Sequence, residues 1–130
     1  MKVKVFDRII IVIALVAIML TTVIGASATT YTSTLSLSAG SAFWGSARSY
    51  EGDGNLQIKF TGSGSSGNGG TNVIEPYERI LGFDYACGYK YVGTSVNETW
   101  TNCPTGTYKI YFANNGSTTW SSSSVTMKSW

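Results

Sequence analysis

Two cysteines, Cys87 and Cys103, are the most reactive side chains of this sequence, and they lie in its most aromatic stretch. Up to Tyr91, every second residue of that stretch is aromatic or cysteine: Phe83, Tyr85, Cys87, Tyr89 and Tyr91. This period of two places the five side chains on one face of a β-strand. A hairpin centred on Ser95 would set Cys87 opposite Cys103, within reach of a disulfide.

In an exported chain of this size, two cysteines most simply form one structural disulfide. Closing a loop of this length stabilises a fold by about 3 kcal/mol in the chain-entropy model. The alternative is that both thiols are free or that they pair between chains. We predict the intramolecular disulfide Cys87–Cys103.

The other reactive side chains form no catalytic or metal-binding pattern. The sequence has no histidine, which removes the most common general base and metal ligand, and with it any serine–histidine or cysteine–histidine site. Most carboxylates stand at turns or at outward strand positions, where a solvated surface charge is the ordinary interpretation. We therefore predict that the protein is not an enzyme and needs no metal and no cofactor.

Three aromatic residues are candidates for ligand binding: Trp100, Tyr111 and Trp120. In the hairpin that aligns the cysteines, Trp100 falls opposite Lys90, on the face away from the cysteines. In a second hairpin, with its turn at residues 115–116, Trp120 falls opposite Tyr111, also on the outer face. Outward aromatic side chains on a sheet can stack on sugars or contact proteins. The alternative is that they are cross-strand pairs that only stabilise the sheet, or that the second face is buried as well.

Residues 1–28 are predicted to be a signal peptide. Basic residues precede an unbroken apolar run, Ile9 to Leu20, and residues 26–28 (Ala-Ser-Ala) are the small residues that signal peptidase requires. An uncleaved membrane anchor is the alternative, because residues 9–28 are nearly long enough to span a bilayer. Cleavage after Ala28 removes three of the nine basic residues and one of the seven acidic residues, so the mature chain has no net charge. It therefore lacks the basic surface that nucleic-acid binding requires.

Residues 29–130 are predicted to form a single all-β domain. Short alternating runs are separated by turn signals along this segment: 31–39, 42–51, 56–60, 83–91, 98–103, 107–113 and 118–130. Residues 62–70 are rich in glycine and serine and are expected to form a flexible surface loop. Pro76 argues against a central strand over 72–81, so an edge strand or a single helical turn is expected there. Seven or eight short strands without a convincing helix favour a small antiparallel β-sandwich, and a small closed β-barrel is the alternative.

These features favour a secreted, extracellular, non-catalytic binding domain. Its partner would be a cell-surface glycan or a protein surface, contacted by the outward aromatic side chains, whereas contact with a membrane is not favoured. The alternative is a small secreted antagonist, such as a bacteriocin-like toxin or a membrane-acting β-protein. That alternative depends on the uncharged run 117–127, in which only Val125 and Met127 would face lipid.

Overall fold

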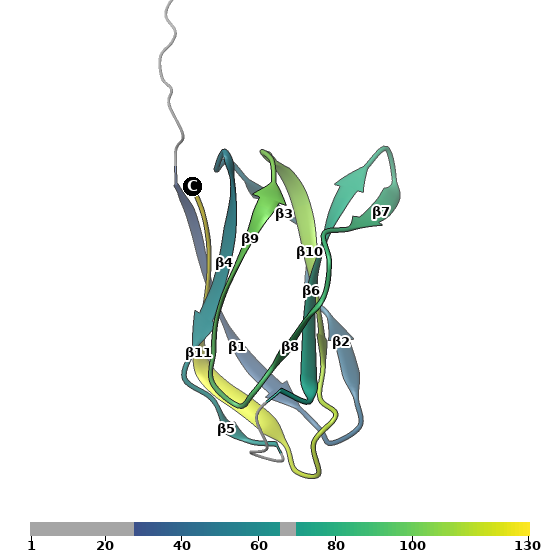
Figure 1. Cartoon of the computed structure of the whole chain (residues 1–130), viewed down its shortest axis with the longest axis vertical. Coiled ribbons are helices and arrows are strands. Elements are labelled where there is room, and N and C mark those ends of the chain that lie inside the picture. Colours follow the sequence, from purple (N-terminus) through teal and green to yellow (C-terminus); the bar gives the residue numbers. More distant parts are fainter. Residues whose placement is uncertain (1–27, 66–69) are drawn as a thin grey trace, which may run out of the picture.

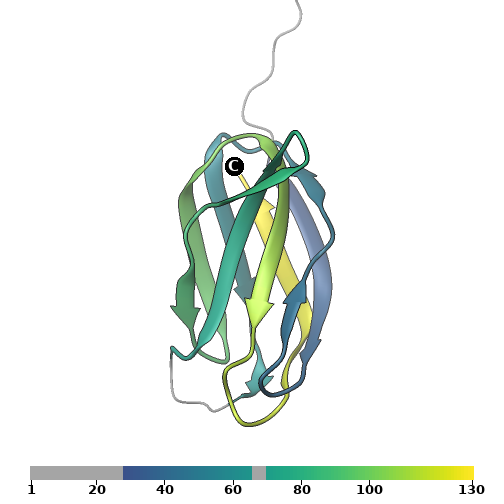
Figure 2. The same ribbon diagram turned by 90° about the vertical axis from the view of Figure 1, so that its right-hand side faces the viewer.

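The computed structural model describes residues 28–65 and 70–130, which form two antiparallel β-sheets without a helix. Except for Ala28, the predicted signal peptide lies outside the described residues. The two sheets face each other as layers and do not close into a barrel (Figure 1); Figure 2 looks onto the outer face of sheet B, the sheet that contains β6 and β10. The all-β prediction is thus confirmed, and the barrel alternative is wrong.

The described residues form eleven strands instead of the predicted seven or eight, because several strands are short and interrupted. Sheet A has the order β1-β11-β4-β9, with β5 beside β11: β1 (Thr29–Leu37), β4 (Gly54–Phe60), β5 (Ser63–Gly64), β9 (Val96–Cys103) and β11 (Trp120–Ser129). Sheet B has the order β2-β10-β6-β7, with β3 beside β10 and β8 beside β6: β2 (Ala42–Trp44), β3 (Arg48–Tyr50), β6 (Asn72–Ile80), β7 (Phe83–Ala86), β8 (Lys90–Val92) and β10 (Gly106–Ala113).

The hydrophobic core lies between the two sheets. Sheet A contributes alternate residues such as Leu56 and Ile58, and sheet B contributes Ile74, Ile110 and Phe112, all of which are buried. This alternation follows from the period of two along a strand, which sends every second side chain inward. Each such side chain stabilises the fold by about 1.5–3 kcal/mol relative to an exposed one.

Several connections pass from one sheet to the other, and the predicted hairpins fail at these crossings. β8 belongs to sheet B and β9 to sheet A, so residues 93–95 connect the layers instead of turning a hairpin centred on Ser95. Likewise β10 and β11 lie in different sheets, and residues 114–119 cross between them. Both predicted hairpin registers are therefore wrong.

Pro76 lies within β6, which is a central strand of sheet B and not an edge strand or a helical turn. The carbonyl oxygen of Pro76 accepts a hydrogen bond from Cys87 N (2.9 Å), on the side of β6 that carries β7 and β8. Since N–H and C=O of one residue point the same way in an antiparallel strand, the missing N–H also faces that side. On that side β7 ends at Ala86 and β8 begins only at Lys90, so residues 87–89 form no strand. The missing N–H of Pro76 therefore costs the sheet no hydrogen bond between strands.

The predicted flexible loop at 62–70 is partly built into the fold. Ser63–Gly64 form β5 and pair with residues 120–121 of β11. The hydroxyl of Ser65 is buried and donates to Oδ1 of Asn72 (3.0 Å) or of Asn114 (3.2 Å). Residues 63–65 thus pair with the rest of the fold, residues 66–69 lie outside the described part, and the flexibility of the loop stays a prediction.

Candidate functional site

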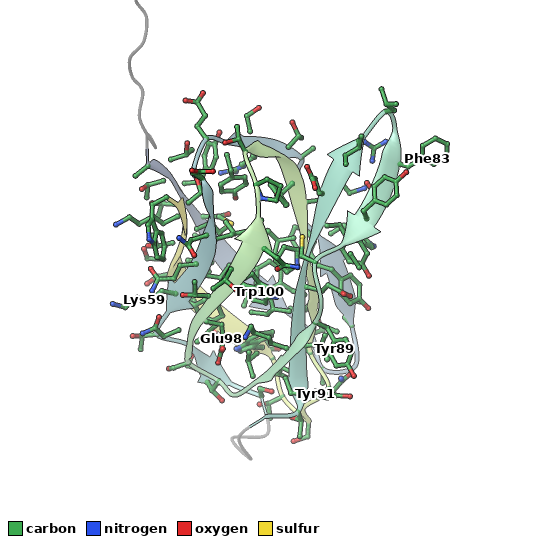
Figure 3. The ribbon with its side chains drawn as sticks, turned by 45° about the horizontal axis from the view of Figure 1, so that its top comes forward. Lys59, Phe83, Tyr89, Tyr91, Glu98 and Trp100 are labelled. Atoms are coloured by element: carbon green, nitrogen blue, oxygen red, sulfur yellow. The ribbon has the colours of Figure 1, made fainter. Side chains whose placement is uncertain are left out.

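Trp100 is buried, with 3% of its surface exposed, so its predicted outward orientation is wrong. β9 pairs with β4, where Leu56 faces Trp100 and Gly54 faces Cys103. Between these two pairs β4 has one residue and β9 has two, and this β-bulge reverses the alternation so that Trp100 and Cys103 both point inward. The indole N–H of Trp100 donates to the carbonyl oxygen of Gly88 (2.6 Å). Figure 3 shows Trp100 between the layers, with Tyr89 and Tyr91 at the sheet B side.

Trp120 has no exposed surface, so its predicted outward orientation is also wrong. Its ring packs against Phe60 (5.6 Å between centroids) and Phe112 (6.3 Å), and its N–H donates to Thr94 O (2.8 Å). A second bulge in β11, at residues 123–124, reverses the alternation between Trp120 and the buried residues that follow. Trp120 is therefore a core residue.

Tyr111 is the one predicted binding residue that lies on an outer face. It belongs to β10, between the buried residues Ile110 and Phe112, and it is partly exposed. Directly opposite it in the sheet is Trp44 of β2, and their ring centroids are 4.9 Å apart. The prediction of an outward Tyr111 is confirmed.

Trp44 is the centre of an aromatic cluster that the sequence analysis missed. Its ring crosses β10 and packs against Tyr77 of β6, with centroids 4.8 Å apart, as well as against Tyr111. Both contacts are tilted, at 56° and 55°, and 44% of the Trp44 surface stays exposed. We call Trp44, Tyr77 and Tyr111 the aromatic platform. It presents an exposed indole that two tyrosines hold in place.

Polar groups surround the aromatic platform, and they are paired with each other. Lys109 Nζ lies 4.9 Å from the Trp44 ring centroid and 3.3 Å from Asp84 Oδ2, and Asp84 also binds Arg79 Nη1 (3.1 Å). The hydroxyl of Tyr77 donates to Glu75 Oε1 (2.8 Å). This bond to a carboxylate raises the pKa of Tyr77 to about 12, so its hydroxyl stays protonated and keeps a donor at neutral pH.

Tyr89 and Tyr91 extend the exposed aromatic surface of sheet B towards β8. Tyr91 pairs with Val73 of β6, whose side chain alternates with the buried Ile74, so both point outward. The two tyrosine rings meet edge to face at 5.2 Å and are 57% and 61% exposed. The outer face of sheet B thus carries aromatic side chains on β2, β10, β6 and the β8 segment.

Cys87 and Cys103 lie close together, although not through the predicted hairpin. Cys103 ends β9 in sheet A, and Cys87 follows β7 in sheet B, so the pair spans the two layers. Their thiols are in hydrogen-bonding contact, and both are free in this structure. The hydrogen bond from Cys103 lowers the pKa of the Cys87 thiol, while the Cys87 thiol and burial raise the pKa of Cys103.

The expectation that the run 117–127 could present apolar side chains to lipid is wrong. Val125 and Met127, which would have faced lipid, are buried in the core between the sheets. In the described part of the chain, no helix is long and apolar enough to cross a membrane. The same residues contain no group of three or more histidine, cysteine or acidic side chains placed to hold a metal ion.

Comparison with known proteins adds no family to this geometry: no protein-family model matches the chain, and no curated protein matches it.

Proposed function

We propose that this protein is a secreted, non-catalytic carbohydrate-binding domain, and that the aromatic platform is its binding surface. The observation that carries this proposal is Trp44, an indole with 44% of its surface exposed that is packed from two sides by Tyr77 and Tyr111. An exposed aromatic ring held rigidly by its neighbours loses little conformational freedom on binding, which favours affinity.

Sugars are the ligands that best fit such a surface. The apolar C–H face of a pyranose ring stacks on the electron-rich face of an aromatic ring, and the sugar hydroxyls need hydrogen-bonding groups at the ring edge. The platform supplies both, because Glu75, Lys109 and the tyrosine hydroxyls border Trp44. The charges are paired through Asp84, which favours a neutral polysaccharide over a sulfated or uronic-acid chain.

A binding assay with insoluble neutral polysaccharides tests this proposal. For a neutral polysaccharide that retains the natural chain, Trp44→Ala should lower the affinity roughly 30-fold or more, as truncation of a central aromatic contact does. The stability of the Trp44→Ala variant should differ little from that of the natural chain, because the Trp44 side chain is half exposed. Trp130→Ala is the matched control, since Trp130 is a similarly exposed tryptophan (38%) at the C-terminus, away from the platform.

Tyr111→Phe should keep most of the binding, because it preserves the ring that supports Trp44. Retention that is equal in the natural chain and in Trp44→Ala would overturn the proposal. So would equal losses in the Trp44 and Trp130 variants, because such losses would reflect a non-specific effect.

A further inference from the structure

The β6–β7 hairpin projects beyond the rest of sheet B at one end of the molecule (Figure 1). Its strands pair from Tyr77↔Ala86 to Ile80↔Phe83, whereas β10 accompanies β6 only as far as Arg79. The turn therefore has no neighbouring strand. Its apolar side chains are strongly exposed: Leu81 at 92%, Phe83 at 67%, Tyr85 at 53% and Ile80 at 43%.

Three of these side chains share one face of the hairpin. Ile80 pairs with Phe83, and Glu78, two residues before Ile80, pairs with Tyr85, so Ile80, Phe83 and Tyr85 point the same way. Nearer the start of β6, the same face of sheet B is turned to the core, and Ile74 on that face is fully buried. At the hairpin the core has ended, and between 43% and 67% of the surface of each of these side chains is exposed.

The turn itself contains a leucine in a backbone conformation that disfavours this residue type. Leu81 has a φ of 53° and Gly82 a φ of 83°. A two-residue turn of this kind normally takes asparagine, aspartate or glycine, because a side chain in the left-handed region is strained. The chain instead places there a leucine with 92% of its surface exposed. Strain and apolar exposure at the same residue indicate a contact that the isolated molecule does not show.

Two charged residues of the hairpin, Arg79 and Asp84, lie on the opposite face and are paired, whereas Glu78 shares the face of Ile80 further from the turn, opposite Tyr108 of β10. Arg79 Nη1 binds Asp84 Oδ1 (3.1 Å), and its Nη2 donates to the carbonyl oxygen of Gly82 (3.4 Å). Asp84 also binds Lys109. Residues 80–83, which form the tip, carry no charge, and the nearest charged pair, Arg79 and Asp84, is mutually neutralised. The tip therefore fits an uncharged apolar environment better than an ionic partner.

The position of the hairpin selects a lipid surface as that environment. β1 begins at Thr29 at the same end of the molecule as the hairpin tip (Figure 1). Eight residues lie between Leu20, the end of the apolar run that begins at Ile9, and Thr29, and the nine residue steps from Leu20 to Thr29 span at most about 32 Å. Whenever that run occupies a membrane, during export or as a retained anchor, this end of the sandwich lies beside the bilayer.

We propose that the β6–β7 hairpin is a lipid-contacting finger, whose tip residues Leu81 and Phe83 enter the interfacial region of a zwitterionic bilayer. Tyr85 lies further from the tip and suits the level of the headgroups, where amphipathic aromatic rings are favoured. The finger is separate from the aromatic platform, and it does not depend on carbohydrate binding.

Depth-dependent fluorescence quenching tests the finger in the full chain. The chain is incorporated into phosphatidylcholine vesicles with brominated acyl chains, and the emission of a tryptophan added by Leu81→Trp is obtained by difference from the natural chain. Ser117→Trp is the control, because Ser117 is exposed in the crossing at the opposite end of the molecule. We expect at least twofold stronger quenching at position 81 than at position 117. Equal quenching at both positions would overturn the proposal.

A second variant separates lipid contact from misfolding and from self-association. Asparagine tolerates a positive φ, so Leu81→Asn should fold normally by circular dichroism while it removes the apolar tip. Protein recovered from the culture medium should bind phosphatidylcholine vesicles roughly tenfold or more weakly when it carries this change. Unchanged vesicle binding would contradict the proposal. So would a lipid-free, concentration-dependent dimer that the variant abolishes, because the tip would then contact a second copy.

Discussion

Tyr50 illustrates how a single buried residue couples this fold to pH. Its ring is 2% exposed and packs edge to face against Tyr31 and Tyr108, at 5.1 and 5.9 Å. Burial raises the pKa of Tyr50 to about 12 from an ordinary value of 10.0, although the nearby Arg48 opposes the rise. The folded state therefore keeps the phenolic proton to a higher pH than the unfolded chain does.

The unfolding free energy should accordingly fall at alkaline pH. The contribution of Tyr50 is complete below pH 10 and is lost as the pH rises from 10 to 12, an effect of about 3 kcal/mol. In Tyr50→Phe, which has no proton to lose, urea denaturation across this range should show a shallower decrease. Some decrease should remain, because burial also raises the pKa of Tyr108. Tyr85→Phe, at an exposed position, is the control, and an equally steep decrease in Tyr50→Phe would contradict this account.

At the scale of the strand, one-residue irregularities decide which side chains reach the surface. β10 pairs Tyr111 with Trp44 but Tyr108 with Arg48, so one extra residue separates β2 from β3. As a result Trp44 points outward although Tyr50, six residues later, is buried. An uninterrupted strand would have placed these two side chains on the same face.

We expect Gly64 of β5 to be required for the pairing of β5 with β11, and not to be an interchangeable residue of a flexible linker. Gly64 and Gly40 both have positive φ angles, 80° and 73°. A Cβ on Gly64 would lie 1.8 Å from the carbonyl oxygen of Thr119, whereas a Cβ on Gly40 would meet nothing within 4 Å. Gly40→Ala should therefore cost only the backbone strain, about 1 kcal/mol. Gly64→Ala should cost at least about 2 kcal/mol more, because the β5–β11 pairing must shift.

Chemical denaturation of the two alanine variants measures this difference directly. Each variant carries the same substitution at a positive φ, so strain cancels in the comparison and the steric clash remains. Equal destabilisation of Gly64→Ala and Gly40→Ala would show that β5 does not hold its place against β11.

For the whole molecule, the cysteine pair offers a covalent link between the layers. We propose that the exported protein forms the disulfide Cys87–Cys103, in which both thiols lose their hydrogens to an extracellular disulfide oxidant that is reduced to two thiols. The bond would tie the end of β9 in sheet A to the break between β7 and β8 in sheet B.

Removing this link should weaken the whole fold. Replacing both cysteines with serine should lower the unfolding free energy of the oxidised protein by about 2–4 kcal/mol. The same replacement should have a smaller effect under reducing conditions. Mass spectrometry of the non-reduced protein from the medium provides the direct check. Two free thiols in that protein would leave Cys87 and Cys103 as packing residues only.

The amino-acid sequence by itself determined the local conformation and the inward residues of the regular strands. The sequence predicted an alternating strand over 107–113 with Tyr111 on its outer face, and both predictions hold in the structure, where the neighbouring Ile110 and Phe112 are buried. They hold because the period of two is a property of the extended backbone and needs no knowledge of the neighbouring strand. The all-β class follows from the same local patterns.

Only the tertiary structure decided which strands pair and where the alternation slips. Each strand of a sandwich needs one apolar face, and this requirement is met equally well in either sheet, so the pattern alone does not distinguish a hairpin from a crossing between layers. A bulge is equally hidden, because it depends on a mismatch with the partner strand. For these reasons Trp100 and Trp120 belong to the core, and the exposed tryptophan of sheet B is Trp44.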